Sequence, residues 1–258
     1  MPEWSLITVS YNSANDLLRF WKDFAHHDGV EWIVVDNCSG DDSVEVARRL
    51  GARVIPLVEN LGFGAANNVG FRASRGEYVA FVNPDVTADA VDLGSLREHL
   101  AKHPLDLVSP QLVNGDGTDQ PNGRGLPYLA YKIANRLKPE KLVGTYLRIA
   151  DGPDVVECDW VMGAVVAGAR ERLAVLGPWD TRFFVYYEDS DLGLRNHRAG
   201  GRSVVLGSVR WLHGWARETT TASASAWRRE IPSMVKFYLR YPRLLAIPRS
   251  LFGRPAGI

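Results

Sequence analysis

Two aspartates follow short apolar runs of the sequence, at points where predicted strands end. Asp36 comes directly after the run 32–35, and Asp85 follows the run 79–82 through a turn that contains Pro84. Because proline has no amide hydrogen to give a central strand, the chain must leave the sheet there, and Asp85 lies at the mouth of a buried strand. A carboxylate in that position can bind a divalent cation together with a substrate diphosphate, as Mg²⁺ sites commonly do. Turn formation alone is the other explanation for both aspartates.

Three further acids, Glu188, Asp189 and Asp191, lie within four residues, directly after the aromatic segment 183–187. Their charges repel one another unless a cation, hydrogen-bond donors or solvent offset the repulsion. One of them could serve as a general base, a role that is worth about 10²–10⁴-fold in rate. The other explanation is a helix N-terminus with acids in its first turn, each worth about 0.3–1 kcal/mol, with Asp189 exposed and Asp191 solvated or capping. Both explanations can hold at once.

The segment 59–68, ENLGFGAANN, predicts a glycine-containing turn that opens a helix. Gly62 and Gly64 allow a backbone to approach a ligand closely, and a helix N-terminus favours anionic groups. However, Asn67 stands where a dinucleotide-binding motif requires a third glycine, and the segment follows the third predicted strand rather than the first. It therefore indicates a polar, ligand-facing loop. His213 ends a later strand in RWLHGW, and a single histidine is more often structural than a ligand.

These residues need a scaffold, and the hydrophobic pattern predicts one. Apolar runs rich in β-forming residues alternate with helical patterns, which is typical of a mostly parallel sheet with helices on both faces. The predicted strands are 4–9, 32–35, 53–57, 78–82 and 105–113; the predicted helices are 13–24, 41–50, a helix to about 74 after the segment 59–68, and 92–102. In such sheets ligands bind beyond the carboxyl ends of the strands, where Asp36 and Asp85 lie.

The second half of the chain has a less regular pattern. Residues 114–153 begin with NGDGTDQPNGRGLPY, which predicts a loop or flap. The remaining predicted elements are a strand over 154–166 interrupted at Gly163, an aromatic strand over 183–187, a helix that ends at Gly200-Gly201, short strands at 204–205 and 209–212, and an amphipathic helix over 222–240.

The composition excludes several classes of protein. The 258 residues carry a formal net charge of zero, so no overall field favours nucleic acid as a partner. Cys38 and Cys158 match neither a metal-binding spacing nor a disulfide framework, which favours a reducing compartment. The N-terminus shows no basic-then-apolar leader, and no run of about 18 apolar residues occurs, so we expect a cytoplasmic protein.

The C-terminal tail after Glu230 contains basic residues and no acid. These residues are Lys236, Arg240, Arg243, Arg249 and Arg254. Because lysine and arginine attract anionic lipid headgroups, the tail permits peripheral contact with the inner membrane face. A solvated surface and a helix packed on the domain form the other explanation.

Seven segments follow one another in a recognisable order: TVSYN (8–12), VVDN (34–37), ENLGFGAANN (59–68), FVNPDV (81–86), WVMGA (160–164), FFVYYEDSDLGLR (183–195) and His213. Together they resemble the inverting family-2 glycosyltransferases of the GT-A fold, and most of all the bacterial rhamnosyltransferase-like branch. The resemblance implies an α/β fold with a Rossmann-like, mostly parallel central sheet and a smaller acceptor-side subregion. We expect a catalytic domain over 1–220, with a nucleotide-binding half at about 1–113 and an acceptor half at about 114–220. An amphipathic helix and basic tail over 221–258 would follow.

The resemblance also implies roles for individual residues. The nucleotide sugar would be held by Val9, Ser10, Tyr11, Asp36, Asn60, Gly62, Asn67, Asn83, Asp85 and Gly163. The metal-binding DxD motif takes the form Asn83-Pro84-Asp85 in this branch, so Asp85 and His213 would hold Mg²⁺ or Mn²⁺. Asp189 would be the general base, and Glu188 would position the acceptor or the metal.

The implied activity is metal-assisted transfer of a sugar from a nucleoside-diphosphate sugar to a hydroxyl group in a single displacement. By branch resemblance the donor is dTDP-L-rhamnose, with UDP- and GDP-linked sugars open. The acceptor class stays open among glycans, lipid-linked molecules and natural products, and a homodimer is also open. Two alternatives are a catalytically inactive module that binds a nucleotide sugar or glycan on the same fold, and a dinucleotide oxidoreductase, which the missing third glycine disfavours.

Overall fold

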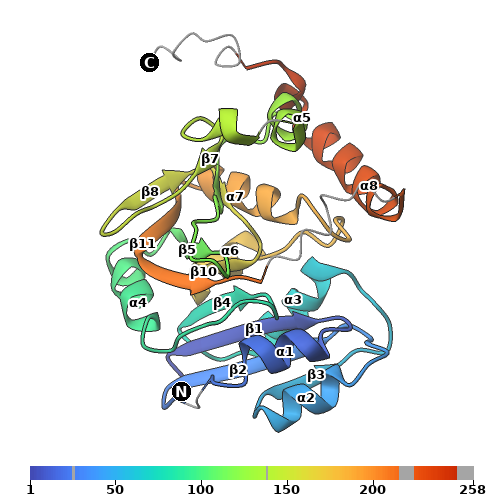
Figure 1. Ribbon diagram of the computed structural model, residues 1–258, viewed down its shortest axis with the longest axis vertical. Helices are drawn as coiled ribbons and strands as arrows, with labels where there is room; N and C mark the ends of the chain where they lie inside the picture. The colour runs from blue at the N-terminus through green and yellow to red at the C-terminus, as the bar shows by residue number, and fades with distance from the viewer. Residues whose placement is uncertain (25–26, 138, 215–223, 249–258) are drawn as a thin grey trace.

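The computed structural model describes residues 1–24, 27–137, 139–214 and 224–248, and it centres on one eight-stranded sheet (Figure 1). The strand order is β3-β2-β1-β4-β10-β5-β11-β8. These strands are β1 (Trp4–Ser10), β2 (Val30–Asp36), β3 (Arg53–Pro56), β4 (Tyr78–Val82), β5 (Leu107–Val113), β8 (Val155–Cys158), β10 (Val165–Ala169) and β11 (Ser203–Leu212). A second sheet, in the order β7-β6-β9, contains β6 (Gly123–Arg124), β7 (Leu147–Arg148) and β9 (Trp160–Val161).

The helices alternate with the strands through the first half of the chain. They are α1 (Ala14–Phe20), α2 (Ser43–Arg49), α3 (Phe63–Ala73), α4 (Leu93–Lys102), α5 (Leu129–Leu137), α6 (Arg170–Leu176), α7 (Glu188–Arg198) and α8 (Ala224–Arg240). Two 3₁₀ helices, η1 (Pro139–Leu142) and η2 (Pro242–Leu245), follow α5 and α8. Among the described residues, none of the helices has the length and apolar character that crossing a bilayer requires.

The predicted mostly parallel sheet is confirmed. β1 runs parallel to β2 and β4, β2 runs parallel to β3, and β11 runs parallel to β5. β10 is antiparallel to both β4 and β5, so it begins at the edge of the sheet where those strands end. The carboxyl ends of β1, β2 and β4 therefore share one edge with the start of β10.

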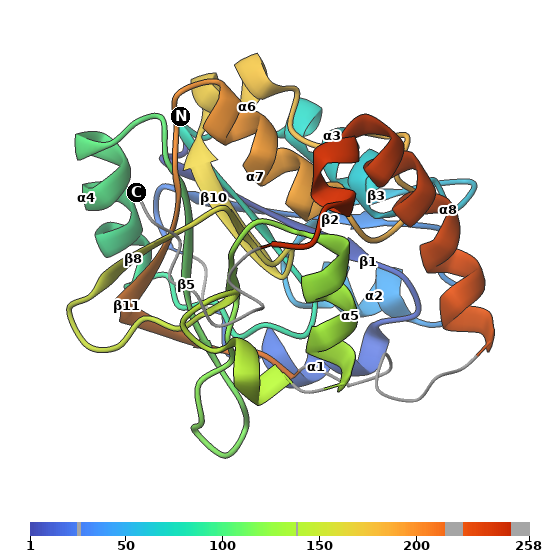
Figure 2. The same cartoon turned by 90° about the horizontal axis from the view of Figure 1, so that it is seen from above.

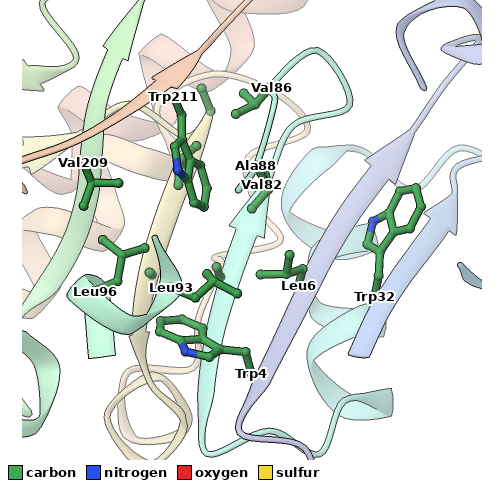
Figure 3. Close-up of a cluster of buried hydrophobic side chains, with 14 of the residues drawn as sticks. Trp4, Leu6, Trp32, Val82, Val86, Ala88, Leu93, Leu96, Val209 and Trp211 are labelled. Carbon is green, nitrogen blue, oxygen red and sulfur yellow. The ribbon is translucent and has the colours of Figure 1, made fainter. Parts of the chain in front are cut away.

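Helices cover both faces of this sheet because the strands alternate their buried side chains between the two faces. One core cluster holds Leu6, Val34 and Ala80 together with side chains of α1, α2 and α4. The intervening residues Ile7 and Phe81 pack in a second cluster that includes side chains of α6 and α7. Figure 3 shows the first cluster, in which Leu93 and Leu96 of α4 lie among Trp4, Val209 and Trp211. In Figures 1 and 2, α5 and α8 both lie beside α7.

Segment 114–153 is not the loop or flap that its composition predicts. It contains β6, α5, η1 and β7. Tyr131 of α5 packs against Tyr146, with ring centroids 5.3 Å apart, and both belong to a buried cluster with Trp160. The turn-rich composition ends before α5 begins, and the aromatic side chains that follow supply enough burial to order a small subdomain.

Three strand predictions in the second half are corrected. The stretch 154–166 is not one strand: β8 pairs with β11, β9 pairs with β6, and β10 pairs with β4, with Gly163 between the last two. The predicted strands 204–205 and 209–212 are parts of β11, whose pairing with β5 shifts between Leu206 and Arg210.

The aromatic segment 183–187 forms no strand, because Tyr186 and Tyr187 have left-handed backbone φ angles of 69° and 71°. Phe183 and Tyr187 are buried against Phe237 of α8 rather than in the sheet. The predicted helix over 222–240 corresponds to α8, and residues 222 and 223 lie outside the described part of the chain.

Candidate active site

The ends of β1 and β2 hold the first predicted carboxylate. Asp36 is buried, and its Oδ1 accepts a 2.9 Å hydrogen bond from the hydroxyl of Ser10, its partner across the parallel ladder. The backbone N–H of Ser39 donates to Oδ2 at 3.0 Å. These donors fix the carboxylate at the carboxyl edge of the sheet. Val9 is buried in β1, and Tyr11 just beyond the strand is exposed.

A pair of asparagines builds the loop between β3 and α3. Asn37 Nδ2 donates to Asn60 Oδ1 at 2.9 Å, and the same oxygen accepts the N–H of Gly62 at 3.0 Å. Asn37 Oδ1 in turn accepts the N–H of Leu61 at 2.9 Å. The resemblance in the sequence assigns Asn60 to the nucleotide but gives Asn37 no role, although Asn37 is the last residue of the matching segment VVDN. In the structure both side chains shape the loop.

Gly62 lies where this loop meets the segment before the acidic cluster. Its φ is +85°, and a Cβ atom there would collide with the carbonyl oxygen of Phe184. The same oxygen accepts a 2.8 Å hydrogen bond from the N–H of Phe63. The close approach that the glycine permits is therefore to protein backbone. Asn67, one turn into α3, is buried, and its Nδ2 donates to the carbonyl of Phe63 at 3.2 Å.

Asp85 and His213 come together at the ends of β4 and β11. His213 Nε2 lies 3.4 Å from Asp85 Oδ2, and the N–H of Gly214 donates to the Asp85 carbonyl at 2.7 Å. His213 is buried, and its Nδ1 lies 2.7 Å from Oε1 of the buried Gln120. Gln120 Nε2 donates to the carbonyl of His213 at 3.0 Å, which leaves Oε1 as the acceptor. Nδ1 therefore carries a hydrogen, and Nε2 faces the side of Asp85.

This arrangement fits a divalent cation. A histidine that binds a metal through one nitrogen usually donates its other N–H to an oriented acceptor, as His213 does to Gln120. In the parts of the chain that the structure describes, no three His, Cys, Asp or Glu side chains gather as a metal centre. Two protein ligands are nevertheless what a cation needs when phosphate oxygens and water complete its coordination, as is usual for Mg²⁺. Asn83, half-buried at the start of the turn, adds an amide rather than a second carboxylate.

Asp189 lies in the first turn of α7 with both oxygens hydrogen-bonded. Oδ2 accepts the N–H of Gly163 at 3.2 Å. Oδ1 accepts the N–H of Ser190 at 2.7 Å and lies 3.3 Å from the Ser190 hydroxyl. Gly163 precedes β10, and the N–H of Asn83 donates to the carbonyl of Ala164 at 2.9 Å. The turn that holds Asp85 and the loop that holds Asp189 are therefore neighbours at one edge of the sheet.

Glu188 differs sharply from its neighbour Asp189. Its side chain is buried, and within the described residues Oε2 has no hydrogen-bond partner. Burial, and then the negative charge of Asp189, raise the pKa of Glu188 from its ordinary value of 4.5 to about 8, while Lys132 acts in the opposite direction. Near neutral pH the Glu188 carboxyl is therefore mostly protonated.

Two cations beside these acids were missed by sequence reasoning. Lys132 of α5 lies near Ser190, and burial lowers its pKa from 10.5 to about 8 against the attraction of Asp189. Arg124 of β6 is buried, burial lowers its pKa, and Asp189 attracts it as well. Both residues come from the segment 114–153, whose turn-rich start hid the helix and the strand that carry them.

Asp191 is neither solvated nor a helix cap, which corrects one of the explanations offered for the acidic cluster. It is fully buried and accepts hydrogen bonds from Arg195 Nε and from the Tyr241 hydroxyl, each at 2.7 Å. Arg240 Nη1 of α8 lies 3.1 Å from its Oδ1. A buried carboxylate with two arginine partners anchors the C-terminal helix to α7. Of the basic tail, Lys236, Arg240 and Arg243 are described, whereas Arg249 and Arg254 lie outside the described residues.

The fold is that of the GT-A glycosyltransferases. Residues 5–150 match the family model described as glycosyl transferase family 2, and the chain belongs to that family. A sequence relative, the N-acetylglucosaminyl-diphospho-decaprenol L-rhamnosyltransferase of Mycobacterium tuberculosis, is 27% identical over 241 residues, which cover 85% of this chain and 78% of the relative.

Two solved structures share the fold at low sequence identity. GalNAc-T7 with UDP, GalNAc and Mn²⁺ superposes with a TM-score of 0.63 at 13% identity, over 96% of this chain and 52% of that one. The mannosyltransferase PcManGT of Pyrobaculum calidifontis, with GDP-Man and Mn²⁺, gives a TM-score of 0.62 at 21% identity, over 96% of this chain and 66% of that one. The chain thus spans about half of the first protein and two thirds of the second.

Proposed function

We propose that this glycosyltransferase inverts the configuration of the sugar that it transfers, with Asp189 as its general base. The carrying observation is the Asp189 carboxylate, held on both oxygens by Gly163 and Ser190 at the edge of the sheet that also holds Asp85. A base must have a fixed direction toward the hydroxyl that it deprotonates, and these hydrogen bonds provide one. The proposed catalytic domain covers 1–220, with the C-terminal helix packed on it.

The donor in this proposal is a nucleoside-diphosphate sugar, with dTDP-L-rhamnose as first choice. The M. tuberculosis relative is named as an L-rhamnosyltransferase, which supports rhamnose as the sugar. The two structural neighbours hold UDP and GDP-mannose, which supports the nucleotide class without selecting a base. Ser10, Asp36 and the loop that Asn37 and Asn60 shape would contact the nucleoside.

Transfer would proceed in one displacement. The acceptor oxygen forms a bond to the anomeric carbon as the bond from that carbon to the diphosphate oxygen breaks, and the hydroxyl proton passes to Asp189. Asp85 and His213 would hold a divalent cation, which supplies positive charge to the departing diphosphate. Because the Glu188 carboxyl is mostly protonated near neutral pH, Glu188 would not serve as the base.

We further propose that the acceptor is lipid-linked and that the protein meets it at a membrane surface. Exposed apolar side chains line one side of α8, namely Ile231, Val235 and Leu239, the last of which is 77% exposed. α5 presents Ile133 and Leu137 to solvent while its Lys132 lies near Ser190, the reverse of an ordinary surface helix. The sequence after Glu230 has five basic residues and no acid, a charge that complements anionic lipid. The relative is named for a diphospho-decaprenol substrate, which supports the same acceptor class.

An inactive binding module on the same fold is the competing function, and replacement of the base separates the two. We expect Asp189→Asn to lower kcat by about 10²–10⁴-fold and to leave nucleotide binding intact, since the base contacts the acceptor rather than the nucleotide. Turnover would be followed as nucleotide release from dTDP-rhamnose, UDP-sugars and GDP-mannose, with a polyprenyl-diphosphate sugar as acceptor. Near-normal turnover in the variant would remove Asp189 from the base role.

Thermal unfolding with dTDP, UDP and GDP, each with Mg²⁺, Mn²⁺ or EDTA, identifies the nucleotide and the metal. A ligand that binds only the folded state at one hundred times its Kd stabilises it by about 2.7 kcal/mol, so the preferred nucleotide raises the unfolding midpoint clearly. Undiminished binding and turnover in metal-free protein would refute the assignment of a metal to Asp85 and His213.

A further inference from the structure

Lys132 reaches from α5 to the first turn of α7. Its Nζ lies 3.4 Å from Ser190 Oγ, 4.4 Å from the ring centroid of Trp160 and 4.5 Å from that of Tyr187. An ammonium close to aromatic ring faces is attracted by them, and most strongly when it is desolvated. The two rings therefore fix the ammonium beside Ser190.

The hydroxyl of Ser190 links this ammonium to Asp189. Ser190 is fully buried, and its Oγ is 3.3 Å from Asp189 Oδ1. An ammonium only donates hydrogen bonds, whereas a hydroxyl both accepts and donates. Since Lys132 donates to Oγ, the hydroxyl hydrogen is left to donate to Asp189. The order of donation is fixed: Lys132 to Ser190, and Ser190 to the carboxylate.

The carboxylate of Asp189 is also held by backbone donors. These are the N–H groups of Gly163 and Ser190. The Ser190 hydroxyl is the side-chain donor, and Lys132 sets the direction of that hydroxyl. α5, which belongs to the acceptor half predicted from the sequence, thus contacts the turn of α7 that carries Asp189.

We propose that Lys132 is a positioning residue for the general base, acting through the Ser190 hydroxyl to hold the Asp189 carboxylate toward the acceptor. This inference rests on the proposed function, because it takes Asp189 as the base. Lys132 itself need not touch either substrate. The charged groups around its ammonium are Glu188 and Asp189 on α7, Arg124 on β6 and Glu230 on α8.

The test compares Lys132→Met, Lys132→Arg, Ser190→Ala and the double variant Lys132→Met/Ser190→Ala with the wild type. Lys141→Met, an exposed lysine of the same segment, is the matched control. We expect Lys132→Met to lower kcat by about 10- to 100-fold, a part of the roughly 10²–10⁴-fold that a general base contributes, with the KM for the donor unchanged. Lys132→Arg recovers much of kcat, since arginine also carries a charged donor.

The double variant and the pH profile separate this role from a merely structural one. If Lys132 acts through Ser190, the double variant loses no more than the worse single variant, within about twofold. The ammonium has a pKa of about 8, so wild-type kcat falls as the pH rises past 8, and Lys132→Arg carries activity to higher pH. Glu188 titrates in the same range but is present in both proteins, so the difference between them reports Lys132.

Several results would overturn the inference. If Lys132→Met keeps the kcat of the wild type, Lys132 does not position the base. If the loss of kcat in the double variant equals the product of the losses in the two single variants, Lys132 does not act through Ser190. A fall in the unfolding midpoint and in donor affinity that parallels the loss of kcat indicates a structural role instead. Should Lys132→Met fail to fold, full activity of Ser190→Ala refutes the proposal by itself. Normal turnover of Asp189→Asn defeats the proposed function, whereas an inactive Asp189→Asn beside a fully active Lys132→Met defeats only this inference.

Discussion

Replacing Glu188 with glutamine should stabilise the protein near neutral pH, since the wild-type side chain is buried with an unpaired Oε2. A carboxyl group whose pKa is raised on folding holds its proton in the folded state while the unfolded chain releases it. The contribution of Glu188 to the free energy of unfolding then falls as the pH rises from about 4.5 to about 8, and this contribution is constant beyond that range. Glutamine, which has nearly the shape of the protonated acid, removes this dependence.

The magnitude follows from the same pKa values. Each pH unit between 4.5 and the folded-state value costs about 1.36 kcal/mol, so wild type loses about 3 kcal/mol by pH 7. This figure is a ceiling, because local rearrangement around a buried charge reduces the loss. We therefore expect Glu188→Gln to exceed wild type by about 1–3 kcal/mol at pH 7 and to equal it near pH 4.5.

Urea unfolding at intervals from pH 4.5 to pH 8.5, followed by tryptophan fluorescence, measures this difference. Glu140→Gln, at an exposed glutamate of η1, is the matched control and should run parallel to wild type. Parallel curves for wild type and Glu188→Gln, or a variant that is less stable at pH 7, would refute the reasoning. Activity gives a second reading: Glu188→Gln should keep kcat within a few-fold of wild type at pH 7.

Three further predictions concern the other contacts of the site. Gly62→Ala should lower the unfolding midpoint more than Gly117→Ala does. A positive φ costs an alanine about 1–2 kcal/mol at either position. Of the two, only Gly62 also faces a backbone carbonyl, with which the new Cβ would collide. Gln120→Leu should weaken the binding of Mn²⁺ by about 10- to 100-fold, as measured by calorimetry with nucleotide present. If the variant and the wild type bind Mn²⁺ with equal affinity, Gln120 does not orient His213. Replacing Ile231, Val235 and Leu239 together with serine should abolish sedimentation of the protein with phosphatidylglycerol vesicles. Val175→Ser, at another exposed position on α6, is the control and should still sediment. Sedimentation of the triple variant would exclude α8 as the membrane contact.

The strands of the first half of the chain could be predicted from the sequence because their burial follows from their own residues. β1, β2 and β4 are continuous apolar runs covered on both faces, so each signals its own burial, and the carboxylates that follow mark their ends. Asp36 and Asp85 stand at this one edge for that reason. The parallel sheet and its helices were confirmed.

The second half depends on contacts that no local pattern reveals. The run 183–187 has the composition of a strand, yet Phe183 and Tyr187 are buried against Phe237, about fifty positions later in the chain. The run also turns through two left-handed tyrosines. Lys132 was missed for a similar reason. The composition of segment 114–153 predicts a loop, whereas the structure has α5 there, with Ile133 and Leu137 exposed and Lys132 turned toward Ser190.

The position of β10 has a consequence for how the chain can fold. β4 ends at Val82 and pairs on one side with β1, but its other edge is completed only by β10, which begins at Val165. During synthesis the edge of β4 therefore stays without its partner until the whole of α4, β5 and the small second sheet has been made. Fragments that end at about residue 113 should expose that strand edge and aggregate, because an unpaired apolar strand is a template for other chains. Residues 1–113 are thus not a separable folding unit, and the strand β10 completes the sheet late.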